Sequence, residues 1–241
     1  MVNKSQLKLI KSLQQKKYRN EHSLFVIEGV KSIIELLSSK LSLFKLFGTK
    51  EHIANFLNYK IEVISAVDLK KISALQNPSG VLAVFKIPKP TLIDTNDWVL
   101  VLDNVRDPGN LGTIIRLCDW FGIENIVCSK ETVDCYNPKV IQATMGSIAR
   151  INIVYKDLEE FLIKTNKPIY GAFLEGNSIY ETAFLKSGIL VIGNEANGIS
   201  TKIEAIIKKK ITIPQFGIQS AESLNVATAT AIFLSELRGR N

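Results

Sequence analysis

The chain lacks any apolar run approaching the roughly 18 residues that a membrane-spanning helix needs. Its N-terminus is polar and basic, without the apolar core of a secretory signal. Only three cysteines occur, Cys118, Cys128 and Cys135, with no C-x-x-C pair and no neighbouring histidines. This pattern argues against a disulfide framework and against a zinc site. We therefore expect a protein of the reducing cytoplasm that binds neither a membrane nor a metal.

Histidine is almost absent as well, because His22 and His52 are the only two and both precede residue 90. A histidine general base is thereby excluded from the second half of the chain, where chemistry must use Asn, Arg, Glu and Ser. The chain has no G-x-G-x-x-G sequence, which disfavours a nicotinamide site. Residues 193–200 approach the phosphate-binding pattern G-x-x-x-x-G-K-[ST], but Ile199 replaces its lysine. A generic nucleotide-binding enzyme is therefore disfavoured.

The net charge of +7 is concentrated at one end of the chain. Residues 1–50 hold ten Lys or Arg and three acidic residues, and the remaining chain is balanced with 20 of each. A concentrated positive field captures polyanions, whereas a solvated lysine-rich face is the plainer explanation. The charge distribution favours a nucleic acid as partner, and both explanations stay open at this point.

Residues 1–88 alternate helical and strand patterns, which indicates a compact α/β unit. Leu7, Ile10 and Leu13 predict an amphipathic helix over 5–16 with lysines on its other face. The spacing predicts further helices at 30–37, 51–57 and 66–75, and strands at 24–27, 43–47, 61–64 and 81–87. Pro88 and Pro90 then interrupt both kinds of element. A boundary is therefore expected at about 88–96, between domains at 1–88 and 96–241.

The second domain is predicted to be α/β, with a parallel sheet covered by helices on both faces. Continuous apolar runs such as residues 189–192 suit strands that are buried on both sides. The strands are expected at 98–102, 125–128, 151–155, 169–174, 189–192 and 211–213. The helices are expected at 111–121, 138–145, 158–164, 201–208 and 224–237. In such sheets ligands bind at the loops that leave the carboxyl ends of the strands.

The first unusual loop follows the predicted strand at 98–102. Its Pro108 fixes φ and Gly109 tolerates positive φ, which is typical of a turn. Asn110 then lies near a helix N-terminus, where its side chain is expected to cap. Arg116 comes four residues after Gly112, about one helical turn later, so we expect it to face the same opening. An ordinary capped helix with a surface arginine would explain the same residues.

Two further loops carry unusual patterns. Gly193 and Gly198 flank Glu195 directly after the buried strand at 189–192. A tight turn into a helix, with an acidic residue favoured by the helix dipole, is the alternative explanation. After the strand at 211–213, Ser223 is a candidate N-cap. Alternating Ala and Thr at 226–231 then give a helix whose small faces allow close packing.

Together the three loops resemble the three motifs of the SpoU/TrmH branch of the knotted SPOUT methyltransferases. The motif residues, in order along residues 97–238, are Asn104, Asp107, Pro108, Asn110, Gly112 and Arg116; Ile192, Gly193, Asn194, Glu195, Gly198 and Ile199; and Ile213, Pro214, Ser223, Leu224 and Asn225. Each motif alone is weak. Three in the family's order, with a strand before or within each, form a specific pattern.

The first domain resembles the substrate-binding domain that precedes the catalytic domain in rRNA-modifying members of this family. The resemblance lies in residues 25–29, the helix after them and residues 78–81. That family domain in turn resembles RNA-binding ribosomal proteins, and the basic first fifth of the chain falls within it. The sequence departs from the family pattern in a longer stretch between Pro214 and Ser223, and in residues 118–120, which replace smaller ones.

The resemblance implies an α/β fold with a SPOUT domain, a parallel sheet and a deep trefoil knot, behind a smaller N-terminal α/β RNA-binding domain. It also implies a homodimer with each active site near the interface, and S-adenosylmethionine as cofactor. By the same resemblance, four residues line the cofactor site: Gly193, Gly198, Ile213 and Leu224. Five residues would serve catalysis: Asn110, Arg116, Glu195, Ser223 and Asn225.

The family pattern assigns activation of the ribose 2′-hydroxyl to Arg116. A guanidinium has a pKa above about 12 and is normally not a base. We therefore hypothesise that Arg116 holds the adjacent RNA phosphate and stabilises negative charge on the attacking oxygen. Asn110 and Glu195 would orient Arg116 and the ribose, and Ser223 and Asn225 would complete the polar pocket.

The resemblance therefore predicts S-adenosylmethionine-dependent 2′-O-ribose methylation of RNA, with rRNA favoured as substrate because of the additional N-terminal domain. A tRNA 2′-O-methyltransferase is the first alternative. The second alternative, from another class, is an RNA-binding homologue without catalysis. The presence of Asn110, Arg116, Glu195 and Asn225 argues against this inert protein.

Overall fold

The computed structural model describes residues 2–217 and 222–239. The chain forms two compact units, which are Met1–Lys89 with Asp134–Ala149 and Pro90–Val133 with Arg150–Asn241. The first unit therefore takes in a segment that the sequence-based boundaries assign to the second domain. Among the described residues, no helix combines the length and the apolar character needed to cross a membrane.

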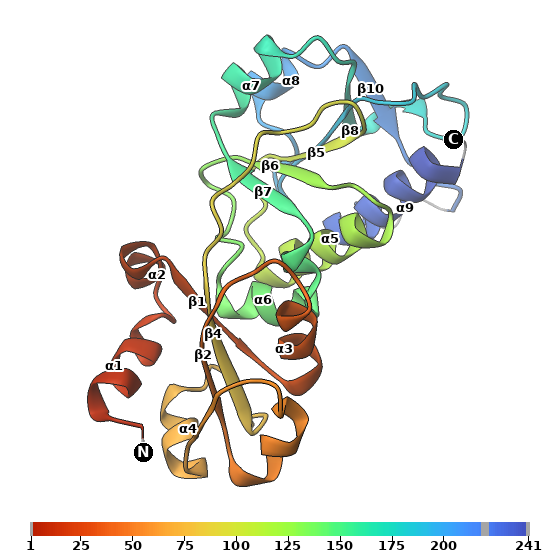
Figure 1. The fold of residues 1–241 in the computed structure, drawn as a ribbon. Helices are drawn as coiled ribbons and strands as arrows, with labels where there is room; N and C mark the ends of the chain where they lie inside the picture. Colours follow the sequence, from red (N-terminus) through yellow and green to blue (C-terminus); the bar gives the residue numbers. More distant parts are fainter. Residues whose placement is uncertain (1, 218–221, 240–241) are drawn as a thin grey trace. The chain divides into compact units, whose positions relative to one another are not determined.

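The first unit is built on a four-stranded mixed sheet in the order β1-β4-β2-β3 (Figure 1). Strands β1, β4 and β2 are antiparallel neighbours, and β3 pairs with β2 in parallel. The elements are α1 (Lys4–Ser12), α2 (Lys16–His22), β1 (Leu24–Glu28), α3 (Val30–Leu37), β2 (Leu43–Gly48), the 3-10 helix η1 (Lys50–Phe56), β3 (Ile61–Val63), α4 (Ala66–Ile72) and β4 (Val81–Lys86), followed after residue 133 by α6 (Pro138–Thr144) and the 3-10 helix η2 (Ser147–Ala149).

Helices α1 and α4 cover one face of this sheet. Two of the apolar side chains predicted from spacing, Ile10 of α1 and Leu13 at its C-cap, are 3% and 1% exposed and pack into the same core as Leu69 of α4. That core also contains the strand residues Leu24, Phe47, Leu82 and Val84. The regular spacing of apolar residues in α1 therefore corresponds to a buried face, as predicted.

The inserted segment contributes to the other side of the same sheet. Phe25 of β1 stacks on Phe85 of β4, and its ring lies 4.9 Å from the ring of Tyr136. Helices α3 and α6 both pack against β1. Gly146 has φ +100° and lies so close to Glu35 of α3 that a β-carbon would be 2.8 Å from that side chain. Residues 134–149 therefore complete the core of the first unit.

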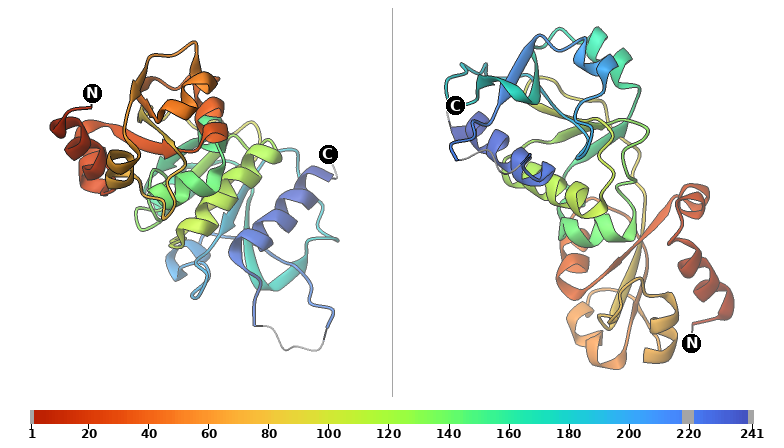
Figure 2. Two further views of the ribbon diagram at one scale, coloured as in Figure 1. Left: turned by 90° about the horizontal axis from the view of Figure 1, so that it is seen from below. Right: turned by 180° about the vertical axis from the view of Figure 1, so that it is seen from behind.

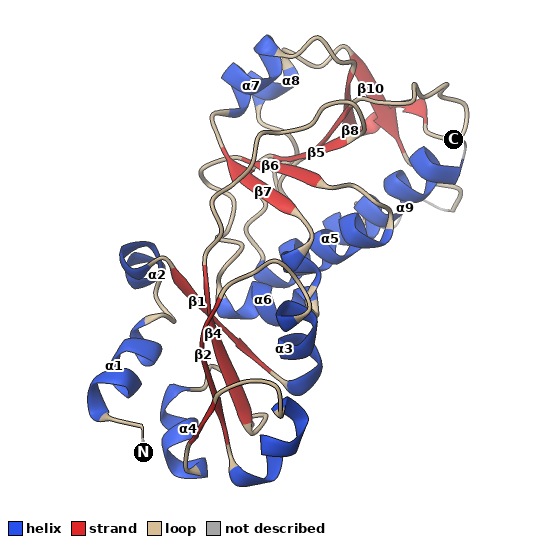
Figure 3. Ribbon diagram, viewed as in Figure 1, coloured by secondary structure: helices blue, strands red, loops and turns tan. Residues whose placement is uncertain are grey.

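The second unit has a six-stranded sheet, entirely parallel, in the order β10-β8-β9-β5-β6-β7 (Figure 3). This arrangement confirms the predicted α/β fold with a parallel sheet. Its elements are β5 (Val99–Leu102), α5 (Pro108–Trp120), β6 (Asn125–Cys128), β7 (Asn152–Tyr155), α7 (Leu158–Lys164), β8 (Ile169–Ser178), β9 (Ile189–Ile192), α8 (Thr201–Glu204), β10 (Lys209–Thr212) and α9 (Val226–Gly239).

Helices cover both faces of this sheet, also as predicted. On one face, Val99 and Val191 share a buried core with Leu162 of α7 and Ile203 of α8. On the other face α5 and α9 pack side by side (Figure 2). The small residues of α9 serve this packing within one chain, since Thr230 is 0% exposed.

Several element boundaries differ from the predictions. The helix predicted over 5–16 ends at Ser12, and α2 follows as a separate helix because Gln15 is extended, with φ −99° and ψ 135°. The helix predicted at 51–57 is the 3-10 helix η1. The helix predicted at 201–208 ends at Glu204, and the strand predicted at 211–213 is β10, which begins at Lys209, two residues before the buried Ile211.

Candidate functional site

The three motif loops leave the carboxyl ends of β5, β9 and β10, at one edge of the parallel sheet. Strands β5 and β9 are neighbours, with Leu102 opposite Ile192, so the first two loops begin side by side. Asp103 fixes them to each other, because its Oδ2 accepts a hydrogen bond of 2.8 Å from the backbone NH of Ser200. Asn194 Nδ2 donates to the backbone oxygen of Asn104 at 2.7 Å. The two loops thus form one connected surface.

A chain of three side chains joins one residue from each motif. Asn110 Nδ2 donates to Glu195 Oε1 at 3.0 Å, and Asn225 Nδ2 donates to Asn110 Oδ1 at the same distance. Asn110 therefore uses both ends of its amide to connect loops that lie 85 and 115 positions away in the sequence. The three loops therefore converge at this point, and we call Glu195, Asn110 and Asn225 the polar triad.

Helix α5 fixes the position of Asn110. Its N-cap is Asp107, whose Oδ1 accepts a hydrogen bond of 2.8 Å from the backbone NH of Asn110, and Pro108 occupies the first helical position. The prediction that Asn110 caps this helix is therefore wrong. Because the carboxylate of Asp107 takes the cap, the amide of Asn110 is left to bind the other two loops.

The second loop closes on itself before α8 begins. The backbone groups of Asn194 and Gly198 exchange hydrogen bonds of 2.8 and 3.0 Å, and Asn194 Oδ1 accepts from the NH groups of Ala196 and Asn197. A β-carbon on Gly193 would lie 2.2 Å from the carbonyl carbon of Gly198, which itself has φ +66°. Both glycines are thus required by the fold of the loop. Glu195 projects from it and does not belong to the first turn of α8.

The third loop ends where Asn225 caps α9. Asn225 Oδ1 accepts hydrogen bonds from the backbone NH groups of Ala227 at 2.9 Å and Thr228 at 3.2 Å. The predicted cap, Ser223, is exposed and lies two residues earlier in the chain. The cap sets the position of Asn225 in the polar triad. Ile213 is half-buried, whereas Leu224 remains 49% exposed next to Asn225.

Arg116 lies on an exposed face of α5, with Thr113 and the 84% exposed Trp120. It follows Asn110 by six residues, which turns it about 120° away around the helix axis. Within residues 2–217 and 222–239 it forms no hydrogen bond or ion pair. The expected contacts from Asn110 and Glu195 to Arg116 are not present, because these two residues bind each other. Orientation of Arg116 by them stays a prediction.

The sequence analysis assigned no role to Asp103 or to the motif residue Asn194, which connect the first two loops. Both follow buried strands directly, and a polar residue in that position of a parallel sheet is the signal that could have identified them. Asp103 is only 5% exposed, and the removal of its carboxylate from water costs free energy. The hydrogen bond from the backbone NH of Ser200 offsets part of this cost.

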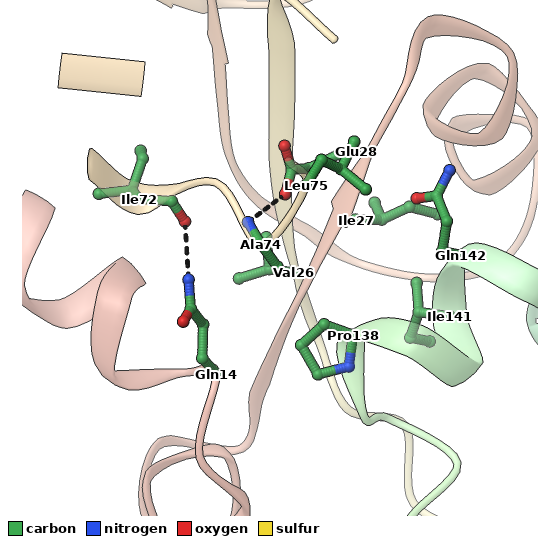
Figure 4. A pocket seen from close by; sticks show the side chains of 10 residues that line it. All are labelled: Gln14, Val26, Ile27, Glu28, Ile72, Ala74, Leu75, Pro138, Ile141 and Gln142. Atoms are coloured by element: carbon green, nitrogen blue, oxygen red, sulfur yellow. Dashed lines mark hydrogen bonds between the residues drawn. The ribbon is translucent and has the colours of Figure 1, made fainter. Parts of the chain in front are cut away.

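The first unit contains a small cavity unrelated to the three loops (Figure 4). It measures about 20 Å³, enough for one water molecule, and is bordered by Gln14, Glu28 and Gln142 among others. Burial raises the pKa of the Glu28 carboxyl, and hydrogen bonds from Ser73 Oγ and the NH of Ala74 lower it to a smaller extent. Glu28 thereby connects β1 to the loop after α4.

A parallel sheet whose strand ends carry a polar cluster built from three loops defines an α/β enzyme that binds its ligands at that edge. The model of the SpoU rRNA Methylase family matches residues 97–235, and that of the MRM3-like substrate binding domain matches residues 4–83. The chain belongs to the SpoU rRNA methylase family, with the substrate-binding domain at its N-terminus.

Similar proteins cover nearly the whole chain. The 23S rRNA (guanosine(2553)-2′-O)-methyltransferase RlmP of Bacillus subtilis is 31% identical over 95% of this chain and 94% of its own length. A Porphyromonas gingivalis structure assigned to the TrmH family of RNA methyltransferases is 38% identical over the full length of both chains, with a TM-score of 0.89. The structure of an AdoMet-bound rRNA methyltransferase from Sinorhizobium meliloti is 29% identical over 100% of this chain and 97% of its own, with a TM-score of 0.86.

Proposed function

We propose that this protein transfers a methyl group from S-adenosylmethionine to a ribose 2′-hydroxyl of ribosomal RNA. The observation that carries the proposal is the polar triad, in which Asn110 joins Glu195 and Asn225 and so brings all three family motifs together. The relatives from Bacillus subtilis and Sinorhizobium meliloti, which match almost end to end, support rRNA as the substrate class.

The residues around the polar triad fit a cofactor with an apolar ring and a polar sugar and amino-acid part. Leu224 leaves half of its side chain exposed beside the triad, and Ile213 is half-buried on the same loop. We assign apolar contact with adenine to these two residues, while Gly193 and Gly198 keep the second loop closed so that its backbone can face the cofactor. When bound, S-adenosylmethionine supplies the electrophilic methyl group.

The remaining roles follow from charge and exposure. Arg116 is permanently charged, so it holds an RNA phosphate and stabilises negative charge on the 2′-oxygen rather than taking its proton. The proton leaves through that phosphate or through solvent. Ser223 and Asn225 donate to the ribose or to the polar part of the cofactor, and Glu195 holds Asn110 in place.

We further propose that the protein works as a homodimer with a knotted C-terminal domain. On the exposed side of α5, the ring of Trp120 is 84% exposed and would serve as an aromatic anchor for a second copy. Arg116 lies on the same side, which agrees with an active site near the interface. Analytical ultracentrifugation measures the mass of the wild type and of Trp120→Glu in solution. We expect a dimer for the wild type and a shift towards the monomer for the variant, and an equal mass for both would argue against this surface.

A tRNA substrate is the second candidate. A TrmH/SpoU tRNA modifying enzyme from A. aeolicus is 30% identical, but the match covers only 60% of this chain, with a TM-score of 0.52. Residues 4–83 match a substrate-binding domain in addition. The presence of this N-terminal domain favours rRNA over tRNA as the substrate.

We also propose the cytoplasm as the place of action. All three cysteines are buried thiols, which a reducing compartment preserves. Fractionation of cells with an antibody to the protein tests the location, and recovery outside the cytoplasm would contradict it.

The decisive experiment combines methyl transfer with mapping. Purified protein is incubated with radiolabelled S-adenosylmethionine and either rRNA or tRNA, and 2′-O-methyl positions are mapped in cells with and without the protein. We expect label in large RNA and the loss of an rRNA methyl group from deficient cells. Label in tRNA alone would support the second candidate. Calorimetric absence of cofactor binding, together with no transfer, would identify an inert RNA-binding homologue.

A further inference from the structure

The excess positive charge of the chain is concentrated in its first two helices. Residues 1–20 contain six of the 30 basic residues and none of the 23 acidic ones, so the rest of the chain has a net charge of only +1. On α1, Lys4, Lys8 and Lys11 recur at intervals of four and three residues, so they project within about 60° of one another around the helix. All three are exposed, and they point away from the buried Ile10. They form a stripe about 10 Å long.

Two more lysines extend this surface onto α2. Lys16 and Lys17 are both exposed in the first turn of that helix. In the part of the chain that the structure describes, no carboxylate forms an ion pair with Lys4, Lys8, Lys11 or Lys17. We call the five lysines the hairpin lysines, because they lie on the helical hairpin α1–α2. Among the described residues, the charges of Lys4, Lys8, Lys11 and Lys17 are therefore not neutralised by a carboxylate.

Helix stability does not account for these lysines. The N-terminus of a helix carries partial positive charge, so it favours acidic residues and disfavours lysine. Yet Lys4 occupies the first position of α1, Lys16 and Lys17 occupy the first two of α2, and neither first turn has an acidic residue. For Lys4 and Lys17, which pair with no described carboxylate, this placement costs helix stability and points to an external anion that offsets the cost.

A buried arginine fixes the geometry of the hairpin. Arg19 of α2 is 2% exposed, and its Nη1 donates hydrogen bonds of 2.9 Å to the backbone oxygens of Leu13 and Gln14 at the end of α1. Its Nε donates to Asp134 Oδ2 at 3.1 Å, and its Nη2 pairs with the same carboxylate. The corner between α1 and α2 is therefore held rigidly, and so is the spacing between the lysines of the two helices.

We propose that the hairpin lysines bind the phosphodiester backbone of the RNA substrate. The inference rests on the proposed function for the choice of RNA, and it adds the surface and the chemistry of capture. A stripe of flexible ammonium groups on a rigid support matches phosphates, because an ammonium group is a point charge with no fixed donor–acceptor pattern that could read a base. The contact is thus independent of sequence and sensitive to salt, and it leaves the selection of the target ribose to other residues.

The test is the double variant Lys8→Glu/Lys11→Glu, with Lys31→Glu/Lys40→Glu as a control of equal charge change. Lys31 belongs to α3 and Lys40 follows it, and both are exposed. Lysine and glutamate have similar helix propensities, so α1 is expected to fold in the variant. Binding to a labelled large-subunit rRNA transcript is measured between about 50 and 200 mM salt, because the release of counterions from RNA makes affinity fall steeply over this range.

We expect the α1 variant to bind rRNA at least about tenfold more weakly at the lower salt concentration, and to reduce the salt slope by about 2. Its KM for RNA should rise while kcat and cofactor affinity remain unchanged. An equal loss of affinity in the control variant would overturn the assignment of the surface. So would an unchanged affinity in the α1 variant, or equally tight binding of polyglutamate, which would identify an acidic protein as the partner. Because binding is measured without turnover, a failure of the proposed methyl transfer would be seen separately.

Discussion

The polar triad and the hairpin lysines place polar groups in opposite ways. In the triad, Asn110 is a short side chain fixed at both ends of its amide by bonds of 3.0 Å. On the hairpin, the lysines are long side chains on rigid helices, and Lys8 and Lys11 form no ion pair with any described residue. Fixed short groups suit a reaction that needs aligned atoms, and mobile charges suit the capture of a polyanion.

This difference has a kinetic meaning. Changes in the site should lower turnover with little effect on RNA binding, because aligned groups act in the transition state. Changes on the hairpin should alter RNA binding and its salt dependence while turnover is preserved. Substitutions at Arg116, Arg19, Asn225 and Glu28 test what each region contributes to turnover and to stability.

The largest effect is expected at Arg116. Arg116→Ala should lower turnover about 1,000-fold, because a preorganised charge next to the reacting oxygen is lost. The turnover of Arg116→Lys should lie between those of wild type and Arg116→Ala, because lysine keeps the positive charge but lacks the paired NH donors of the guanidinium group. Unfolding in urea should be unchanged within about 0.5 kcal/mol, because the side chain is exposed. Turnover near the wild-type level in Arg116→Ala would remove this residue from the mechanism.

A large effect on stability is expected at Arg19. Arg19→Leu should lower the free energy of unfolding of the first unit by about 3 kcal/mol, because it leaves the carboxylate of Asp134 without this partner. Lys17→Leu, in the same helix but exposed, is the matched control and should change stability little. Urea denaturation followed by tyrosine fluorescence measures both. Equal stability of the two variants would show that the buried pair does not hold the hairpin.

A smaller effect separates the two roles of Asn225. Asn225→Ser keeps a side chain that can cap α9, whereas Asn225→Ala does not, so the alanine variant should be less stable by about 1 kcal/mol. Both variants lose the bond to Asn110 and should lose turnover to the same extent. Thermal unfolding and single-turnover methyl transfer measure the two properties. Full turnover in the serine variant would show that the triad bond is dispensable.

The smallest effect concerns Glu28 and pH. Burial raises the pKa of this carboxyl above its ordinary value of 4.5, so the folded protein binds the proton more tightly than the unfolded chain. The resulting stability is fully present below about pH 4.5 and is lost as pH rises through the raised pKa. Glu28→Gln does not titrate, so wild type should lose stability relative to this variant on going from pH 4 to pH 7. A difference that is constant with pH would contradict the raised pKa.

The fold of the second unit follows from its sequence to a large extent, because continuous apolar runs such as residues 189–192 have few alternatives to a buried parallel strand. The sequence predicted that Asn110, Glu195 and Asn225 share one site, and the structure brings these three together, but their mutual hydrogen bonds were not predicted. Asn110 was assigned to a helix cap, but Asp107 occupies that position and leaves Asn110 to bridge the loops. Competition between neighbouring polar side chains for one cap is decided by backbone geometry, which a single sequence does not display.

The first unit was less predictable for a different reason. Helix α2 has no apolar periodicity, and it depends on Arg19 and its partner Asp134, 115 positions away. Its charged sequence therefore resembles a loop until the partner is known. The insertion of residues 134–149 was invisible for the same reason, since their apolar pattern fits a helix on either unit equally well.

That insertion bears on how the protein can be divided. The chain passes between the two units three times, after residues 89, 133 and 149. A fragment cut at residue 88 would lack Tyr136 and α6, and would leave Phe25 without a cover on that side. The N-terminal unit therefore cannot be transferred as residues 1–88 alone. A chimera that joins its RNA-capture surface to another enzyme must also include residues 134–149, which lie within the catalytic part of the sequence.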